Sequence, residues 1–186
     1  MSIPNIITFA RLLAVPAAVY FILVGDLGWA FWVVVGAGVS DALDGAIARM
    51  FRSLTALGAY LDPLADKVLL VSVFIALGHV NELPLWLVIV VVSRDIMIVG
   101  GVMLLYTLKE ALVMQPSTIS KINTATQIAL SIAVLAPAGL GLPNLVVQGI
   151  DVVNALVWGV LATTLLSGAG YLYRGGRLFN RYGGVK

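Results

Sequence analysis

The chain contains no cysteine, one histidine (His79) and few charged residues, which make up 11% of its 186 positions. The absence of cysteine excludes disulfides, thiolate metal sites and a cysteine nucleophile. A single histidine excludes a multi-histidine metal centre, so any metal ion would be a hard cation held by oxygen ligands. The net charge of +2 is too small to indicate nucleic-acid binding.

Apolar residues are abundant, at 61% of the chain, and the mean hydropathy is +1.05. This composition is typical of a membrane protein that crosses the bilayer several times. A helix needs about 20 mainly apolar residues to span a bilayer. By that measure the sequence predicts an all-α integral membrane protein, one domain over residues 1–186 with a retained first helix. The six predicted transmembrane helices cover residues 6–24, 29–51, 56–78, 84–107, 118–138 and 149–173.

Lysine and arginine are unevenly distributed among the connections between these spans. They flank the second and fourth connections and form a cluster at the C-terminal end, whereas the first, third and fifth connections contain none. Because basic residues favour the cytoplasmic side, both termini are predicted to be cytoplasmic. In a bacterium the protein would lie in the inner membrane, with the second connection facing the cytoplasm.

Four of the nine acidic residues form two close pairs beside that connection: Asp41 with Asp44, and Asp62 with Asp66. An ionised carboxylate in hydrocarbon is costly unless it is paired, hydrated or bound to a metal. On α-helices each pair would share a face, and antiparallel neighbours joined by a short turn would set the two faces opposite each other. The mutual repulsion of four carboxylates would be relieved by one or two divalent cations, and oxygen ligands suit Mg²⁺ or Mn²⁺.

Small residues accompany the aspartates. Gly45, Ala48 and Gly58 would leave room for a ligand, and the planar guanidinium of Arg49 could pair with a phosphate. The alternative is that the small residues only allow close helix packing. A single aspartate is equally well explained by a structural ion pair, but four on two facing surfaces are not.

Together these residues form the pattern Asp41-x2-Asp44-Gly45-x2-Ala48-Arg49-x8-Gly58-x3-Asp62-x3-Asp66. At every fixed position it resembles the signature of the CDP-alcohol phosphatidyltransferase family, and the resemblance extends over essentially the whole chain, including "IPNIITFAR" at residues 3–11. It implies a homodimeric membrane enzyme that moves a phosphatidyl group from a CDP-linked lipid to an alcohol and releases CMP.

The resemblance also implies roles for individual residues. The four aspartates would bind two divalent cations, Mg²⁺ or Mn²⁺, on the pyrophosphate, and Asp66 would also be the general base for the incoming hydroxyl. The residues expected to bind the nucleotide and pyrophosphate are Asn5, Thr8, Gly45, Ala48, Arg49 and Gly58.

Two basic residues in the second half are candidates for binding the acceptor. Arg94 lies too deep in the fourth span to be a topological anchor, so a polar cavity is expected around it. Lys121 opens the fifth span. The alternatives are an internal ion pair of Arg94 with Asp95 or with one of the four aspartates, and a Lys121 that only caps its helix.

"DPLADK", "SRD" and "SKINTATQ" together resemble the eukaryotic-type cardiolipin synthases of the family. That branch would transfer the phosphatidyl group of CDP-diacylglycerol to phosphatidylglycerol. The alternative is a phosphatidylglycerophosphate synthase, which would use glycerol 3-phosphate. A remote alternative is a cation-coupled transporter, and metal-dependent CMP release would separate transport from transfer.

Overall fold

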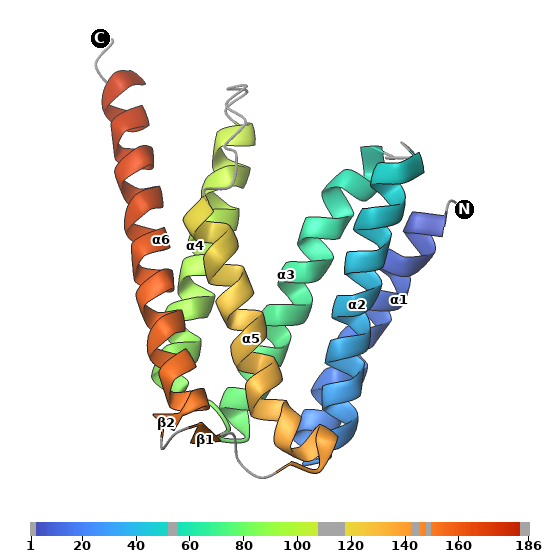
Figure 1. Ribbon diagram of the computed structural model, residues 1–186. Helices are drawn as coiled ribbons and strands as arrows, with labels where there is room; N and C mark the ends of the chain where they lie inside the picture. The colour runs from blue at the N-terminus through green and yellow to red at the C-terminus, as the bar shows by residue number, and fades with distance from the viewer. Residues whose placement is uncertain (1–2, 52–55, 108–117, 143–145, 148–149, 183–186) are drawn as a thin grey trace. The chain divides into compact units, whose positions relative to one another are not determined.

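The computed structural model describes the backbone of residues 3–51, 56–107, 118–142, 146–147 and 150–182, and the side chains of residues 12–40, 67–100, 118–142 and 151–171. Over these residues the backbone forms six α-helices and one two-stranded hairpin (Figure 1). The elements in chain order are α1 (Ile3–Leu23), α2 (Leu27–Phe51), α3 (Ala56–His79), α4 (Leu85–Thr107), α5 (Thr118–Leu140), β1 (Val146–Val147), β2 (Ile150–Asp151) and α6 (Val152–Tyr182).

Each predicted span coincides with one helix, but the limits of the last one differ. Residues 150–151 were predicted to be helical and instead pair antiparallel with β1. The helix begins one residue later because a carboxylate oxygen of Asp151 accepts a hydrogen bond from the backbone N–H of Val153, at 3.0 Å, and so caps the first turn. At its other end α6 continues to Tyr182, beyond the predicted limit of 173. The prediction was limited by the apolar length of the segment, and the helix continues beyond the last apolar stretch.

Two helical segments among the described residues are long and apolar enough to cross a membrane, Thr118–Leu140 and Val152–Tyr171. Shorter apolar helical stretches cover Leu12–Leu23, Leu27–Ser40 and Lys67–His79. These findings support a membrane protein, while the six-span topology stays a prediction.

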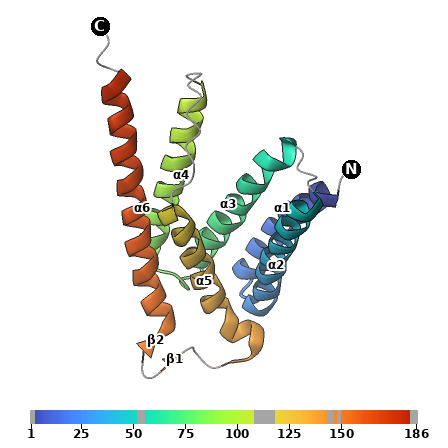
Figure 2. The same ribbon diagram turned by 45° about the horizontal axis from the view of Figure 1, so that its top comes forward.

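The contacts divide the chain into two compact units. The first unit comprises Met1–Leu85 with Ser131–Val153. Within it α1 packs against both α2 and α3, and Figure 2 shows α1 and α2 running side by side. The largest fully buried side chains of this packing are apolar: Ile22, Val73, Phe74, Leu77 and Leu135.

Local chemistry sets the helix ends in the first unit. The chain leaves α1 through Gly25 (φ +81°) and leaves α5 through Gly141 (φ +64°). Glycine suits both positions because it has no Cβ to clash in this left-handed conformation. Asp26 then begins α2, its carboxylate accepting a hydrogen bond from the backbone N–H of Trp29 at 3.4 Å.

The second unit comprises Trp86–Leu130 with Asn154–Lys186 and contains α4, the first half of α5 and α6. Its buried side chains are of two kinds. The buried apolar side chains are Leu87, Val88, Val91, Leu130, Val157 and Val160, and the others are polar. The polar set is Arg94, Asp95, Ser120, Asn123, Gln127, Thr164 and Ser167.

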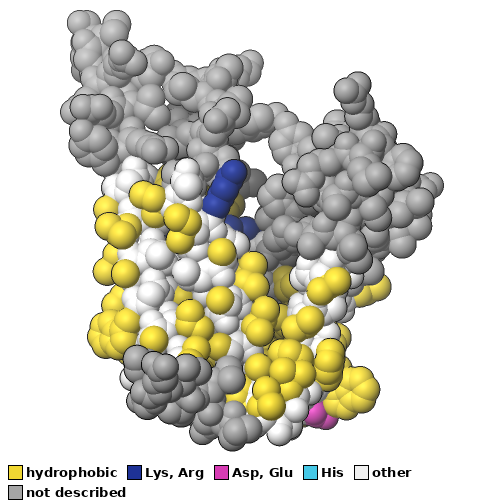
Figure 3. All heavy atoms as spheres, in the orientation of Figure 1, with side chains coloured by type: hydrophobic (Ala, Val, Ile, Leu, Met, Phe, Trp, Pro, Cys, Tyr) yellow, Lys and Arg dark blue, Asp and Glu magenta, His cyan; other side chains and the backbone are white. Residues whose placement is uncertain are grey.

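Large apolar side chains are exposed on the described helices, and Figure 3 shows hydrophobic side chains spread over much of the described surface. On α4 and α6 they include Ile89, Ile96, Trp158 and Leu166, each more than half exposed. Such a surface is unfavourable in water and suits contact with lipid tails.

Candidate functional site

The helices that carry the four aspartates have formed as predicted. Asp41 and Asp44 lie in α2, and Asp62 and Asp66 lie in α3. A helical backbone is the condition on which the shared face of each pair depended. The side chains of all four lie outside the described residues, as do those of the predicted nucleotide-binding set: Asn5, Thr8, Gly45, Ala48, Arg49 and Gly58.

Among the residues whose side chains are described, no group of three or more His, Asp or Glu is placed to hold a metal ion. The four aspartates, whose side chains lie outside the described residues, stay the predicted metal ligands. Their carboxylate oxygens are the ligand type that Mg²⁺ and Mn²⁺ prefer.

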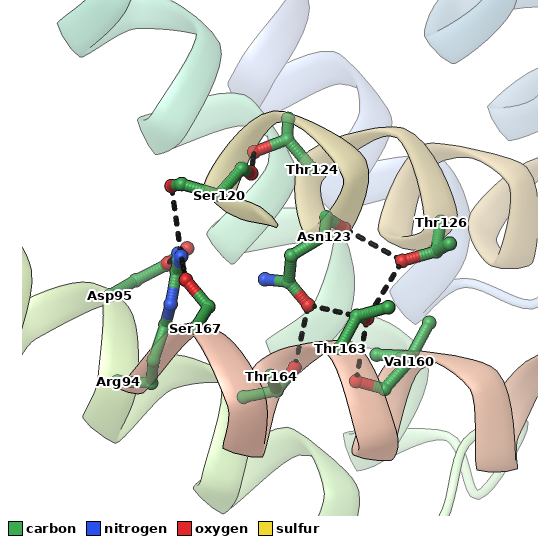
Figure 4. Close-up of polar contacts among 10 residues, drawn as sticks. All are labelled: Arg94, Asp95, Ser120, Asn123, Thr124, Thr126, Val160, Thr163, Thr164 and Ser167. Atoms are coloured by element: carbon green, nitrogen blue, oxygen red, sulfur yellow. Dashed lines mark hydrogen bonds and ion pairs between the residues drawn. The ribbon is translucent and has the colours of Figure 1, made fainter. Parts of the chain in front are cut away.

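The described polar site lies in the second unit, where α4, α5 and α6 meet (Figure 4). Its centre is Arg94, whose side chain is only 3% exposed. Nη1 of Arg94 donates to a carboxylate oxygen of Asp95 at 2.5 Å. The internal pair with Asp95, one of the alternatives for Arg94, is thus present, and it offsets the charge of a buried guanidinium.

Two hydroxyls complete the contacts of Arg94. Nη2 donates to Oγ of Ser120 on α5 at 2.9 Å and to Oγ of Ser167 on α6. The guanidinium of Arg94 thereby joins α4, α5 and α6, which it can do because its N–H donors point in several directions within one plane. Lys121, the second predicted acceptor-binding residue, follows Ser120 and is exposed.

Asn123 forms a second polar centre on α5 and is fully buried. Its Oδ1 accepts hydrogen bonds from Thr163 at 2.9 Å and from Thr164 at 2.8 Å, both on α6. Thr126 contacts the hydroxyl of Thr163 at 3.1 Å and also donates to the backbone carbonyl of Asn123 at 2.9 Å. These contacts join α5 to α6 around the fully buried amide of Asn123, as polar side chains do between membrane helices.

In the sequence Asn123 stood only as part of "SKINTATQ" with no role assigned to it, and its partners on α6 were not predicted. The signal was present, because Thr163, Thr164 and Ser167 stand at helical spacing within an otherwise apolar segment. Ser and Thr are common in membrane helices, where each can bond to its own backbone; the single hydroxyl proton of Thr163 can reach the carbonyl of Gly159 or Val160 instead of Asn123. Their pairing with another helix is visible only once the helices are packed.

Comparison with known proteins gives the family context. The family model described as CDP-alcohol phosphatidyltransferase matches residues 1–166. The chain is 34% identical over 176 residues to a probable cardiolipin synthase (CMP-forming) of Drosophila melanogaster, covering 92% of this chain and 53% of that protein. It is 39% identical over 104 residues to a cardiolipin synthase (CMP-forming) of Streptomyces coelicolor, covering 53% of this chain and 48% of that protein.

A relative named for the other acceptor also matches. The chloroplastic CDP-diacylglycerol–glycerol-3-phosphate 3-phosphatidyltransferase 1 of Oryza sativa subsp. japonica is 32% identical over 190 residues, covering 92% of this chain and 56% of that protein. The chain thus spans about half the length of the curated relatives it matches. The family match includes both aspartate pairs, and the resemblance of the signature is confirmed: this chain belongs to the CDP-alcohol phosphatidyltransferase family.

Proposed function

We propose that the protein is a cardiolipin synthase that transfers the phosphatidyl group of CDP-diacylglycerol to phosphatidylglycerol and releases CMP. The observation that carries the proposal is the set of two aspartate pairs at the family's spacings, on helices α2 and α3 of a chain that belongs to this family. The relatives named cardiolipin synthase support the choice of acceptor.

In the proposed reaction a hydroxyl oxygen of phosphatidylglycerol bonds to the lipid-side phosphorus of CDP-diacylglycerol. The bond from that phosphorus to the CMP oxygen breaks, and the hydroxyl proton passes to Asp66, acting as general base. Two divalent cations, held by Asp41, Asp44, Asp62 and Asp66, would neutralise the negative charge of the pyrophosphate. The roles of Asn5, Thr8, Gly45, Ala48, Arg49 and Gly58 in holding the nucleotide are part of the same proposal. The enzyme would act as one membrane domain in a homodimer, with its site open to the cytoplasm.

The charge around Arg94 favours a lipid acceptor. The guanidinium is buried and already paired with Asp95 at 2.5 Å, so Arg94 and Asp95 together carry no net charge. Glycerol 3-phosphate brings two negative charges, which a neutral pair would compensate poorly. Phosphatidylglycerol brings one negative charge and a glycerol with two hydroxyls. Lys121, exposed at the start of α5, stays a proposed contact for the phosphodiester.

Purified protein supplied with CDP-diacylglycerol and Mg²⁺ tests the assignment. We expect CMP release with phosphatidylglycerol, formation of cardiolipin, and loss of both on chelation of the metal. CMP release only with glycerol 3-phosphate would leave the reaction type unchanged and make the protein a phosphatidylglycerophosphate synthase. The rice relative is named for that acceptor. No CMP release with any alcohol would overturn the proposal.

A further inference from the structure

Two donor groups in the second unit stand out because they are buried and lack a partner. Among the described residues, neither Nδ2 of Asn123 nor Nε of Arg94 makes a hydrogen bond. The Asn123 side chain has no exposed surface and that of Arg94 has 3%. A buried N–H without an acceptor is unfavourable. Neither atom therefore has an oxygen acceptor among the described side chains.

The amide of Asn123 is held so that its nitrogen points toward Arg94 (Figure 4). The Thr163 and Thr164 hydroxyls hold Oδ1 from the α6 side, at 2.9 and 2.8 Å. Figure 4 shows the nitrogen pointing away from these threonines and toward Arg94. An amide N–H and a guanidinium N–H are both donors and cannot bond to each other. An oxygen acceptor placed between them would satisfy both.

The other polar groups around this position limit the charge of that oxygen. Nη1 and Nη2 of Arg94 are already engaged by Asp95, Ser120 and Ser167. The Arg94–Asp95 pair is neutral as a whole, and the amide of Asn123 carries no charge. A hydroxyl or a singly charged phosphodiester oxygen fits these surroundings, and a dianionic phosphate does not.

We infer that Asn123 is a specificity-determining residue whose Nδ2, together with Nε of Arg94, binds one oxygen of the acceptor's glycerol-phosphodiester headgroup. The inference rests on the proposed function, because it takes phosphatidylglycerol as the acceptor. It adds an uncharged side chain on α5 to the residues expected to bind the headgroup, beside the basic residues Arg94 and Lys121. Thr163 and Thr164 are positioning residues that keep the amide in the orientation that presents its nitrogen.

The decisive variant is Asn123→Asp. The aspartate keeps an oxygen for the Thr163 and Thr164 hydroxyls, replaces the donor that faces Arg94 with an acceptor, and adds a negative charge. The new oxygen would bond to Nε of Arg94 and repel an oxygen of the ligand. We expect the KM for phosphatidylglycerol to rise roughly tenfold or more, with the KM for CDP-diacylglycerol unchanged and the melting temperature not lowered.

Thr124→Val is the matched control. Thr124 is one position along α5, and its hydroxyl bonds to the backbone carbonyl of Ser120 in its own helix, at 3.2 Å. This variant should keep the wild-type KM for both substrates. If Asn123→Asp is folded and keeps the wild-type KM for phosphatidylglycerol, or if it changes the KM values of both substrates equally, Asn123 only joins helices or binds water and the inference is wrong. If Asn123→Asp does not fold, Asn123→Ser is measured in the same way with the same two outcomes.

A binding measurement separates this inference from the proposed function. Short-chain phosphatidylglycerol should raise the melting temperature of the detergent-solubilised wild type and have less effect on Asn123→Asp. Wild-type protein that makes phosphatidylglycerophosphate and no cardiolipin would contradict the proposed function. If the wild type makes cardiolipin but phosphatidylglycerol stabilises wild type and variant equally, the role of Asn123 is contradicted and the proposed function stands.

Discussion

Arg94 combines two interpretations that the sequence left as alternatives. Its pairing with Asp95 makes it a structural residue, because removing one partner of a buried ion pair typically costs about 3–5 kcal/mol. Its Nε nevertheless stays without a hydrogen-bond partner among the described residues, and this is the atom that we propose to contact the acceptor. The contacts with Asp95, Ser120 and Ser167 fix the position of the guanidinium, as the proposed role in binding requires.

Asp66 is the residue on which the proposed chemistry depends most. Asp66→Asn keeps the size of the side chain and removes both a metal ligand and the base. We expect CMP release to fall by at least about 100-fold, while the melting temperature in detergent stays near that of the wild type. The assay is CMP release with CDP-diacylglycerol and phosphatidylglycerol at saturating Mg²⁺. A variant with near-normal turnover would remove Asp66 from the role of general base.

Among the helices, α5 carries two different kinds of contact. Near its beginning it contributes polar side chains, Ser120 to Arg94 on α4 and Asn123 to the threonines of α6. Near its end, in the first unit, it approaches α2 closely. The position of Gly139 lies against the ring of Phe31, and a Cβ added at Gly28 would lie 3.2 Å from the backbone oxygen of Ala138. Hydrogen bonds determine one end of this helix and close packing determines the other.

Gly139→Ala tests the packing between α5 and α2. A Cβ at this position would overlap the ring of Phe31, so the side chain or the helix must move. Overpacking of this kind costs about 1–3 kcal/mol, and we expect a lower melting temperature in detergent. Gly159→Ala on α6 is the control, because nothing lies within 4 Å of its added Cβ. That variant should be neutral or slightly stabilised. Equal melting temperatures for the two variants would contradict the close contact, and adding Phe31→Leu should restore part of the loss in Gly139→Ala.

At the scale of the whole molecule, the described surface is rich in large apolar side chains, which are unfavourable in water. Large hydrophobic side chains are exposed on the described helices, and two helical segments are long and apolar enough to span a bilayer. The buried polar groups of the second unit are joined across helices, an arrangement expected where no water competes for their hydrogen bonds. An amphiphilic donor and acceptor would meet such an enzyme within the plane of the membrane.

The absence of cysteine makes the predicted topology directly measurable. Single cysteines introduced as Ser53→Cys in the second connection and Glu82→Cys in the third should lie on opposite sides of the membrane, because basic residues favour the cytoplasmic side. We expect a membrane-impermeant maleimide to label Glu82→Cys in intact cells and to label Ser53→Cys only after permeabilisation. Labelling of both in intact cells, or the reverse pattern, would contradict the orientation with cytoplasmic termini.

Composition and apolar length determined the helical class and the position of all six helices among the described residues, and the resemblance of one motif to a known signature indicated the family. They could do so because apolar length and the four aspartates at fixed spacings are local properties of the chain. Only the packed helices showed that Arg94 is paired with Asp95 and bonded to Ser120 and Ser167, and that Asn123 is turned by threonines 40 and 41 residues away. A hydrogen-bond partner depends on which helix faces which, and no local pattern contains that information.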